Sequence, residues 1–250
     1  MVRQEDAGGS TDPAQQEPIR QAEHLFWHGK FPEALEHLTQ LESQEALSEL
    51  TQLQSQLLKC RILAQLDIKK ALDVTTQVIK TSQDLDLPLI QVDALLVMAE
   101  TLQYLGKVKD SQTFVEQGKA VLATISSISA SDLTAREATV VALEGRIYTF
   151  PGPTERAVKC IQQSLRLREQ RDKPQEITQS FTYLVQMKHY LHKGELERAE
   201  EYLQQSVTIR EQLQHPPEIA QSCIWLGWAY SQQGEKERAL EFFQQSLAIY

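Results

Sequence analysis

The sequence repeats itself with a period near 40 residues, and no other feature constrains the fold as strongly. The stretch "KGELERAEEYLQQSVTIREQ" at 193–212 returns 40 positions later as "QGEKERALEFFQQSLAIY" at 233–250. A third copy, "PGPTERAVKCIQQSLRLREQ", lies at 151–170, and three weaker copies precede it. One small residue marks each copy, with spacings of 37, 40, 46, 42 and 40: Ala34, Ala71, Ser111, Ala157, Ala199 and Ala239. A chain of about six repeats needs no single globular core, because each repeat packs on its neighbours.

Each repeat has the pattern of two helices. Apolar and small residues within 195–212 recur three or four positions apart, and the preceding segment, 177–191, has the same spacing. Gly194 lies between them, where a left-handed helix C-cap favours glycine, and Gly152 and Gly234 occupy equivalent places. Proline-containing linkers separate successive pairs at 84–89, 171–176 and 214–219. No segment has a strand pattern, so we predict an all-α chain of helix hairpins.

The repeat boundaries divide the chain into a short tail and an array. Residues 1–16 are polar, and we expect a disordered N-terminal tail there. The array then occupies 17–250, with approximate units 17–45, 46–83, 88–127, 132–171, 174–213 and 216–250.

Two glycines fall in the middle of predicted helices. Gly145 and Gly227 each cost about 1 kcal/mol relative to alanine at such a position, so an interior glycine needs a reason. We predict that a partner helix carrying Ala157 or Ala239 approaches closely at these points.

Charge and hydropathy exclude several classes of function. The net charge of −9 argues against general binding to a nucleic-acid backbone. Residues 1–137 carry a balance of −8 and residues 138–250 a balance of −1, so an acidic partner would prefer the second half. No stretch is apolar enough for a membrane span or a signal peptide.

The three cysteines lie far apart, without metal-like or disulfide-framework spacing. We interpret Cys60, Cys160 and Cys223 as small buried apolar residues of a protein in a reducing compartment, and predict a cytoplasmic location.

Catalytic signatures are missing, and we predict no enzymatic activity, no cofactor and no metal. The sequence has no glycine-rich phosphate or dinucleotide loop, no HExxH and no CxxC. His24 and His28 lie four apart on one helical face, with Glu33 and His37 nearby. Such spacing can bind zinc, but without a placed third ligand a structural or surface role is favoured. The same holds for His189 and His192.

The pattern of small and aromatic residues resembles the tetratricopeptide repeat family. The best match is the last repeat, through Leu226, Gly227, Tyr230, Gly234, Ala239, Phe243 and Ser246. The fourth matches through Gly145, Tyr148, Gly152, Ala157, Ile161 and Ser164. The 40-residue period is similar to the long-helix subclass of kinesin light chains, Leu-Gly-Asn-type adaptors and prokaryotic sensors. The resemblance implies an α-solenoid of about six antiparallel hairpins, stacked as a right-handed superhelix, whose concave side holds a peptide or a partner's helix.

The same resemblance assigns seven residues of the first helices to the concave side: Asp93, Leu96, Glu100, Arg146, Lys188, Trp225 and Trp228. Arg146 and Lys188 are suited to a carboxylate or an acidic peptide, and the two tryptophans to aromatic anchors. Glu100 completes the predicted partner-binding set. The alternative is that these charges are solvated and the tryptophans fill space between helices. The sequence contains no asparagine, so the Asn-based carboxylate clamp of chaperone-binding relatives is not available.

Two functions follow from this resemblance. The first is a non-enzymatic scaffold or adaptor that binds a protein segment, without nucleic acid or membrane as partner. The second is a regulatory or sensory part of a larger protein, because "FFQQSLAIY" ends the last helix with an apolar face. Such an end also predicts self-association through the C-terminal helix.

Overall fold

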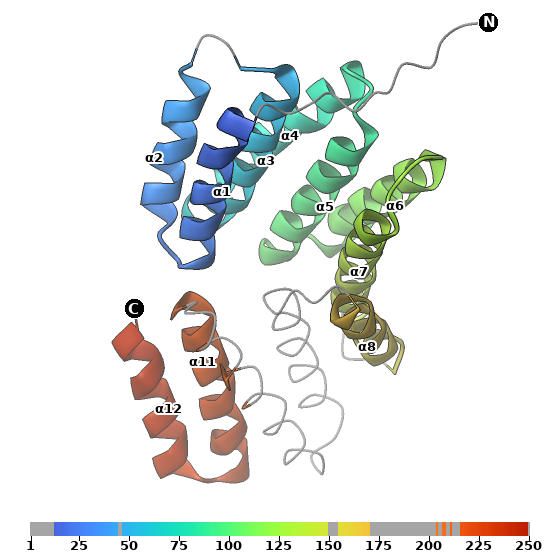
Figure 1. Ribbon diagram of the computed structural model, residues 1–250. Coiled ribbons are helices and arrows are strands. Elements are labelled where there is room, and N and C mark those ends of the chain that lie inside the picture. Colours follow the sequence, from blue (N-terminus) through green and yellow to red (C-terminus); the bar gives the residue numbers. More distant parts are fainter. Residues whose placement is uncertain are drawn as a thin grey trace, which may run out of the picture. The chain divides into compact units, whose positions relative to one another are not determined.

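The computed structural model describes residues 13–44, 47–149, 155–170 and 216–249, with isolated positions at 204, 207, 208 and 211. Within these residues the secondary structure is entirely helical (Figure 1), which confirms the predicted all-α class. The helices are α1 (Pro13–Trp27), α2 (Phe31–Glu42), α3 (Glu49–Leu66), α4 (Ile68–Asp84), α5 (Pro88–Tyr104), α6 (Val108–Thr124), α7 (Ala130–Ile147), α8 (Glu155–Glu169), α11 (Pro216–Gln233) and α12 (Lys236–Ile249).

Neighbouring helices pack in pairs, as the repeat pattern predicts. The pairs α1/α2, α3/α4, α7/α8 and α11/α12 are hairpins. Figure 1 shows the members of α1/α2 and of α11/α12 side by side. Successive hairpins also touch, since α2 packs on α3 and α6 packs on α7. The chain forms two compact units, Met1–Thr101 and Leu102–Tyr250.

The first helix begins earlier than predicted. The expected tail extends to residue 16, but α1 starts at Pro13, a residue favoured in the first turn of a helix. The Gln16 side chain donates a hydrogen bond to Gln54 Oε1 of α3 at 2.8 Å, which ties this turn to the first unit. Residues 1–12 and nearly all of the predicted unit 174–213 lie outside the described residues, as do Gly152 and Gly194.

The small residues that mark the repeats lie in the core. Ala34, Ala71, Ser111, Ala157 and Ala239 are all buried, whereas Ala199 lies outside the described residues. Large apolar side chains surround these positions: in the first hairpin Ala34 clusters with Leu38, Leu58 and Ile62. The small residues that mark five of the six repeats are therefore core positions of their hairpins.

Both interior glycines face the partner helix of their own hairpin. A Cβ at Gly145 would lie 2.6 Å from Ile161 Cδ1 and 3.3 Å from the Ala157 carbonyl oxygen. A Cβ at Gly227 would lie 3.0 Å from the Ala239 carbonyl oxygen. The predicted close approach to Ala157 and Ala239 is confirmed.

Turn and cap chemistry defines the helix ends. Gly234 has a φ of +84°, the left-handed conformation predicted for it between α11 and α12. Pro88 and Pro216 begin α5 and α11, as expected from the proline-containing linkers. Ser129 caps α7 by accepting a hydrogen bond from the backbone N–H of Asp132 at 3.0 Å.

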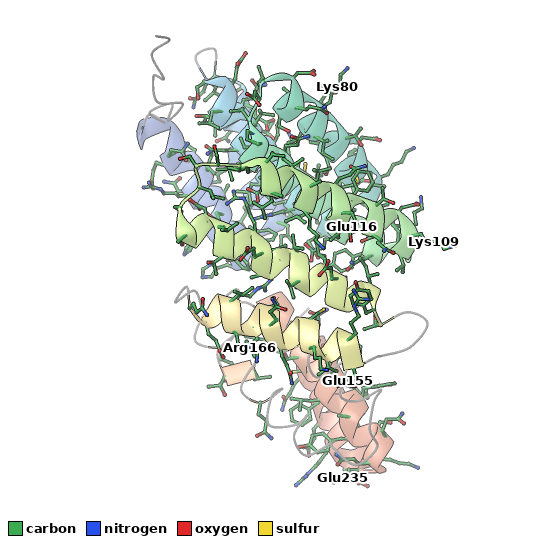
Figure 2. All side chains as sticks on the ribbon, turned by 90° about the vertical axis from the view of Figure 1, so that its right-hand side faces the viewer. Lys80, Lys109, Glu116, Glu155, Arg166 and Glu235 are labelled. Atoms are coloured by element: carbon green, nitrogen blue, oxygen red, sulfur yellow. The ribbon has the colours of Figure 1, made fainter. Side chains whose placement is uncertain are left out.

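Charged side chains occupy the outer surfaces of the helices. Figure 2 shows Lys109 and Glu116 on α6 projecting away from the ribbon, and both are exposed. None of the described helices is both long and apolar enough to cross a bilayer.

Candidate functional site

The last described hairpin presents a partly exposed aromatic pair. Trp225 and Trp228 lie one turn apart on α11, with ring centroids 6.1 Å apart and ring planes at 89°. This edge-to-face geometry is favourable between aromatic rings. Both side chains are half-buried, and Trp225 also packs against the core cluster of Leu226, Tyr230 and Ala239. The pair is therefore held in place by the hairpin while part of its surface faces solvent.

Ile224 extends this aromatic surface and was missed by the sequence analysis. It is 41% exposed, which is unusual for an isoleucine next to a packed core. Ile224 and Trp228 are four residues apart, so they lie on the same face of α11. That spacing could have indicated the surface, because Ile224 falls outside the stripe through Leu226 and Tyr230.

The predicted cation Arg146 lies over an aromatic ring. Its Cζ is 5.0 Å from the ring centroid of Tyr104, a distance at which the cation is attracted to the ring face. The Tyr104 side chain is half exposed, and Arg146 is half-buried at the end of α7. Gln103, the residue before Tyr104, donates a hydrogen bond from its side chain to the Leu143 carbonyl oxygen at 3.1 Å. Arg146 is thus positioned by the end of α5 rather than extended into solvent.

The remaining predicted groove residues are more scattered. Glu100 and Asp93 are half-buried on α5 and belong to the first unit, whereas Arg146 belongs to the second. Leu96, also predicted on the concave side, is buried and contributes to the core instead of offering surface to a ligand. Lys188 lies outside the described residues. Trp225 and Trp228 are in contact with each other.

The histidine pair of α1 forms a stack. The rings of His24 and His28 are 4.1 Å apart, and His28 Nδ1 lies 2.7 Å from the His24 carbonyl oxygen. One ring nitrogen of His28 is therefore occupied by a backbone hydrogen bond. In the described parts of the chain, no three His, Cys, Asp or Glu side chains are grouped as a metal site would require.

The cysteines differ in accessibility. Cys60 and Cys223 are buried, as predicted, but Cys160 is only half-buried. Burial raises the pKa of the Cys60 thiol to about 11, against the lowering effect of a hydrogen bond with Thr75. Burial also raises the pKa of Cys160, and the charge of Glu144 adds to it. Neither thiol has the lowered pKa of a reactive cysteine.

Comparison with known families gives a direct match at the C-terminal end. Residues 188–250 match the profile of the tetratricopeptide repeat family. The predicted resemblance to this family is thereby confirmed. The matched segment contains the tetratricopeptide motif residues of α11 and α12 described above. No curated protein matches the sequence.

Solved structures with tetratricopeptide-type folds resemble nearly the whole chain. BtubC (BKLC) from P. vanneervenii has a TM-score of 0.58 and 16% identity, covering 95% of this chain and 91% of its own. A Rap protein complexed with Competence and Sporulation Factor has a TM-score of 0.67 and 11% identity, covering 94% and 74%. The TPR-like repeats of a Podosopora anserina kinesin light chain have a TM-score of 0.51 and 20% identity, covering 82% and 97%. At these identities the likeness shows the fold: a helical-repeat solenoid.

Proposed function

We propose that this chain is a non-enzymatic protein-interaction module that binds a peptide or helix of a partner on the face of its first helices. Ile224, Trp225 and Trp228 serve as the apolar anchor, because a rigid, partly exposed aromatic cluster is the kind of surface that dominates binding energy. Arg146 and Lys188, which belong to the same unit as this anchor, supply charged contacts. The exposure of the Ile224–Trp228 face is the observation that carries this function.

The comparisons support a binding role. Tetratricopeptide folds generally mediate protein interactions, and the Rap structure holds a bound factor. The nearly neutral charge of residues 138–250 is compatible with an acidic ligand segment near Arg146 and Lys188. The overall charge of −9 does not favour a nucleic acid, and three free cysteines suit a reducing, cytoplasmic setting.

A second candidate function is regulatory: the chain works as a recognition part of a larger assembly. The exposed apolar side chains Leu240, Phe243 and Leu247 on α12 favour it, because exposed apolar surface of this kind commonly marks an interaction site. Self-association through α12 is one form of such an assembly.

Affinity capture with matched variants tests the binding function. We expect partners held by the wild-type chain to be lost with Ile224→Ser/Trp228→Ala and weakened with Arg146→Glu/Lys188→Glu. The control is Lys80→Glu/Lys109→Glu, which makes the same charge change at two exposed lysines on α4 and α6 (Figure 2). Direct titration of each purified partner then measures the loss of affinity. Partners retained equally by all variants would exclude this face.

A further inference from the structure

Exposed apolar surface lies at the turn between α5 and α6, in the middle of the chain. Tyr104, the last residue of α5, is 50% exposed, and Leu105 after it is 42% exposed. Both residues belong to the second compact unit. Exposed apolar residues that adjoin one another often mark an interaction site. The kind of partner that fits this surface follows from the cation beside it.

The Arg146 side chain of α7 lies over the Tyr104 ring. Its Cζ is 5.0 Å from the ring centroid, and the side chain is half-buried. A guanidinium is attracted to an aromatic face, and the long arginine side chain otherwise has many rotamers. The contact with Tyr104 therefore limits the positions of the guanidinium before a ligand binds, which lowers the entropy cost of binding.

A hydrogen bond fixes the same two helix ends. The Gln103 side chain donates to the Leu143 carbonyl oxygen at 3.1 Å. Gln103 directly precedes Tyr104, and Leu143 lies one helical turn before Arg146. All four residues belong to the second compact unit. The ring and the guanidinium are therefore held together by the packing of α5 on α7 as well as by their own attraction.

Another arginine–tyrosine contact has a different place in the repeat. The Cζ of Arg156 lies 3.9 Å from the ring centroid of Tyr148. This contact joins the start of α8 to the end of α7, the two helices of one hairpin. The contact between Tyr104 and Arg146 instead joins the first helices of successive hairpins. The resemblance assigns these first helices to the concave side, where a partner segment binds.

The acidic residue closest to Arg146 in the chain contacts a different helix. Glu144 lies two residues earlier, about 200° away around α7, and its carboxylate binds Lys119 of α6 at 2.7 Å. The residues one turn before Arg146 on its own side of the helix are Ala142 and Leu143, and both are buried. A cation beside apolar surface is suited to an acidic residue that has an apolar neighbour.

The sequence repeats the same combination of residue types one unit later. Phe150 and Lys188 occupy the positions of Tyr104 and Arg146 in the following repeats, seven and eleven residues before the small residue that marks each repeat. Both lie outside the described residues. An aromatic residue followed one repeat later by a cation is thus a recurring pattern, suited to a segment with more than one acidic residue.

We infer that Tyr104 is a positioning residue of the binding face, which holds the Arg146 guanidinium where it binds a carboxylate of the partner segment. The exposed part of the ring then contacts the apolar residue beside that acid. The inference rests on the proposed function and specifies the partner chemistry as Asp or Glu next to an apolar residue. A guanidinium has five N–H donors, so it can bind a carboxylate through two of them while it keeps its contacts with the protein.

A peptide probe tests this role. Dodecapeptides selected on the full chain from a random phage-displayed library are expected to contain Asp or Glu next to an apolar residue. The most enriched peptide, and its counterpart with the acid replaced by the corresponding amide, are then labelled and titrated by fluorescence anisotropy. The ratio of the two Kd values measures the preference for the acid. A general loss of folded protein weakens both peptides equally and leaves this ratio unchanged.

Three variants separate positioning from structure. Tyr104→Leu should reduce the acid preference about two- to fivefold, the effect of losing one cation–π contact at an exposed site. Tyr104→Phe keeps the ring and should keep the wild-type preference. Tyr148→Leu is the matched control, because it removes the contact with Arg156 and should leave the preference unchanged. Tyr104 is half exposed, so its replacement should leave the fold intact, and an unchanged thermal melt checks this.

Two kinds of result would overturn the inference, and they can be told apart. Selected peptides without an acidic residue, an acid preference that survives Tyr104→Leu, or one that Tyr104→Phe or Tyr148→Leu reduces as much, would remove the role of Tyr104 and leave the binding face in place. Failure to select any peptide, or peptides bound equally well by Ile224→Ser/Trp228→Ala, would exclude the binding face itself and the role of Tyr104 with it.

Discussion

Gly227 of α11 lies directly against Phe243 of α12, and a Cβ at Gly227 would be 2.8 Å from each of two carbons of the Phe243 ring. The same Cβ would lie 3.0 Å from the Ala239 carbonyl oxygen, which belongs to helix backbone and cannot move aside alone. Glycine therefore occupies this position although it destabilises a helix interior by about 1 kcal/mol relative to alanine. The reason is that the two helix backbones cross here.

Enlarging Gly227 is expected to destabilise the protein. Gly227→Leu should lower the free energy of unfolding by roughly 1–3 kcal/mol through overpacking, measured by urea denaturation. Gly145→Ala is the matched comparison. The new Cβ at position 145 would lie 2.6 Å from the end of the Ile161 side chain, a group that can rotate away. Gly145→Ala should therefore lower the free energy of unfolding less than Gly227→Ala, whose Cβ would meet the Ala239 backbone. Equal or higher stability of the Gly227→Leu chain would show that the helices are not in close contact.

Glycine is required at position 234 by the backbone conformation and not by a lack of space for a side chain. Its φ is +84°, and no atom lies within 4 Å of the place a Cβ would take. Gly234→Val should therefore cost about 1–2 kcal/mol from left-handed strain, while Gly234→Asn should lose much less because asparagine tolerates this region. Thermal melts of the two variants measure the difference. Equal melting temperatures would contradict the strain argument.

The Lys119–Glu144 pair should contribute a small, salt-sensitive coupling. A double-mutant cycle with Lys119→Met and Glu144→Gln is expected to give about 0.5 kcal/mol at low salt, as exposed pairs do, and less in 1 M salt. The hydrogen bond to Glu144 raises the pKa of Lys119. Because the pKa of Lys119 is higher in the folded protein, its interaction contributes fully to stability at pH values below the unfolded pKa of about 10.4. This contribution is lost as the pH rises through the pKa of the folded protein. The coupling should therefore be constant from pH 7 to about pH 9, and a decline within this range would refute it.

Thiol labelling should distinguish the three cysteines. With a pKa of about 11, Cys60 has only about one part in ten thousand as thiolate at pH 7, and Cys60 and Cys223 are both buried. A disulfide reagent should label one thiol of the native protein, slowly, and Cys160→Ser should abolish that reaction. Urea should expose all the remaining thiols. Fast native labelling of Cys60 would mean that its helix pair opens readily.

The repeat pattern was sufficient to predict the hairpins and their crossings. A small residue at a fixed place in every repeat has one simple physical reason, close helix packing, and Ala71 and Ala157 are buried accordingly. The start of α1 was missed because a polar segment containing Pro13 has little hydrophobic periodicity, although proline is common in a first turn.

The candidate site was harder to predict than the fold. Leu96 was assigned to the concave side from the resemblance to related proteins. Its side chain is buried instead, because an apolar side chain is stabilised by removal from water. The contact of Arg146 with Tyr104 joins residues of two different helices, and no local spacing indicates it. The same is true of Glu42 and Lys59, which meet only when α3 packs on α2.

The opposite polarity of the two junction ion pairs makes the hairpins unequal building blocks. Glu42 faces Lys59, whereas Lys119 faces Glu144. A recombinant chain that joined α2 directly to α7 would set two glutamates against each other, and one that joined α6 to α3 would set two lysines together. The hairpins share a sequence pattern but are not interchangeable at these junctions, and reordering them is expected to cost a small, salt-sensitive part of the stability at each like-charge contact, even when every hairpin keeps its own sequence.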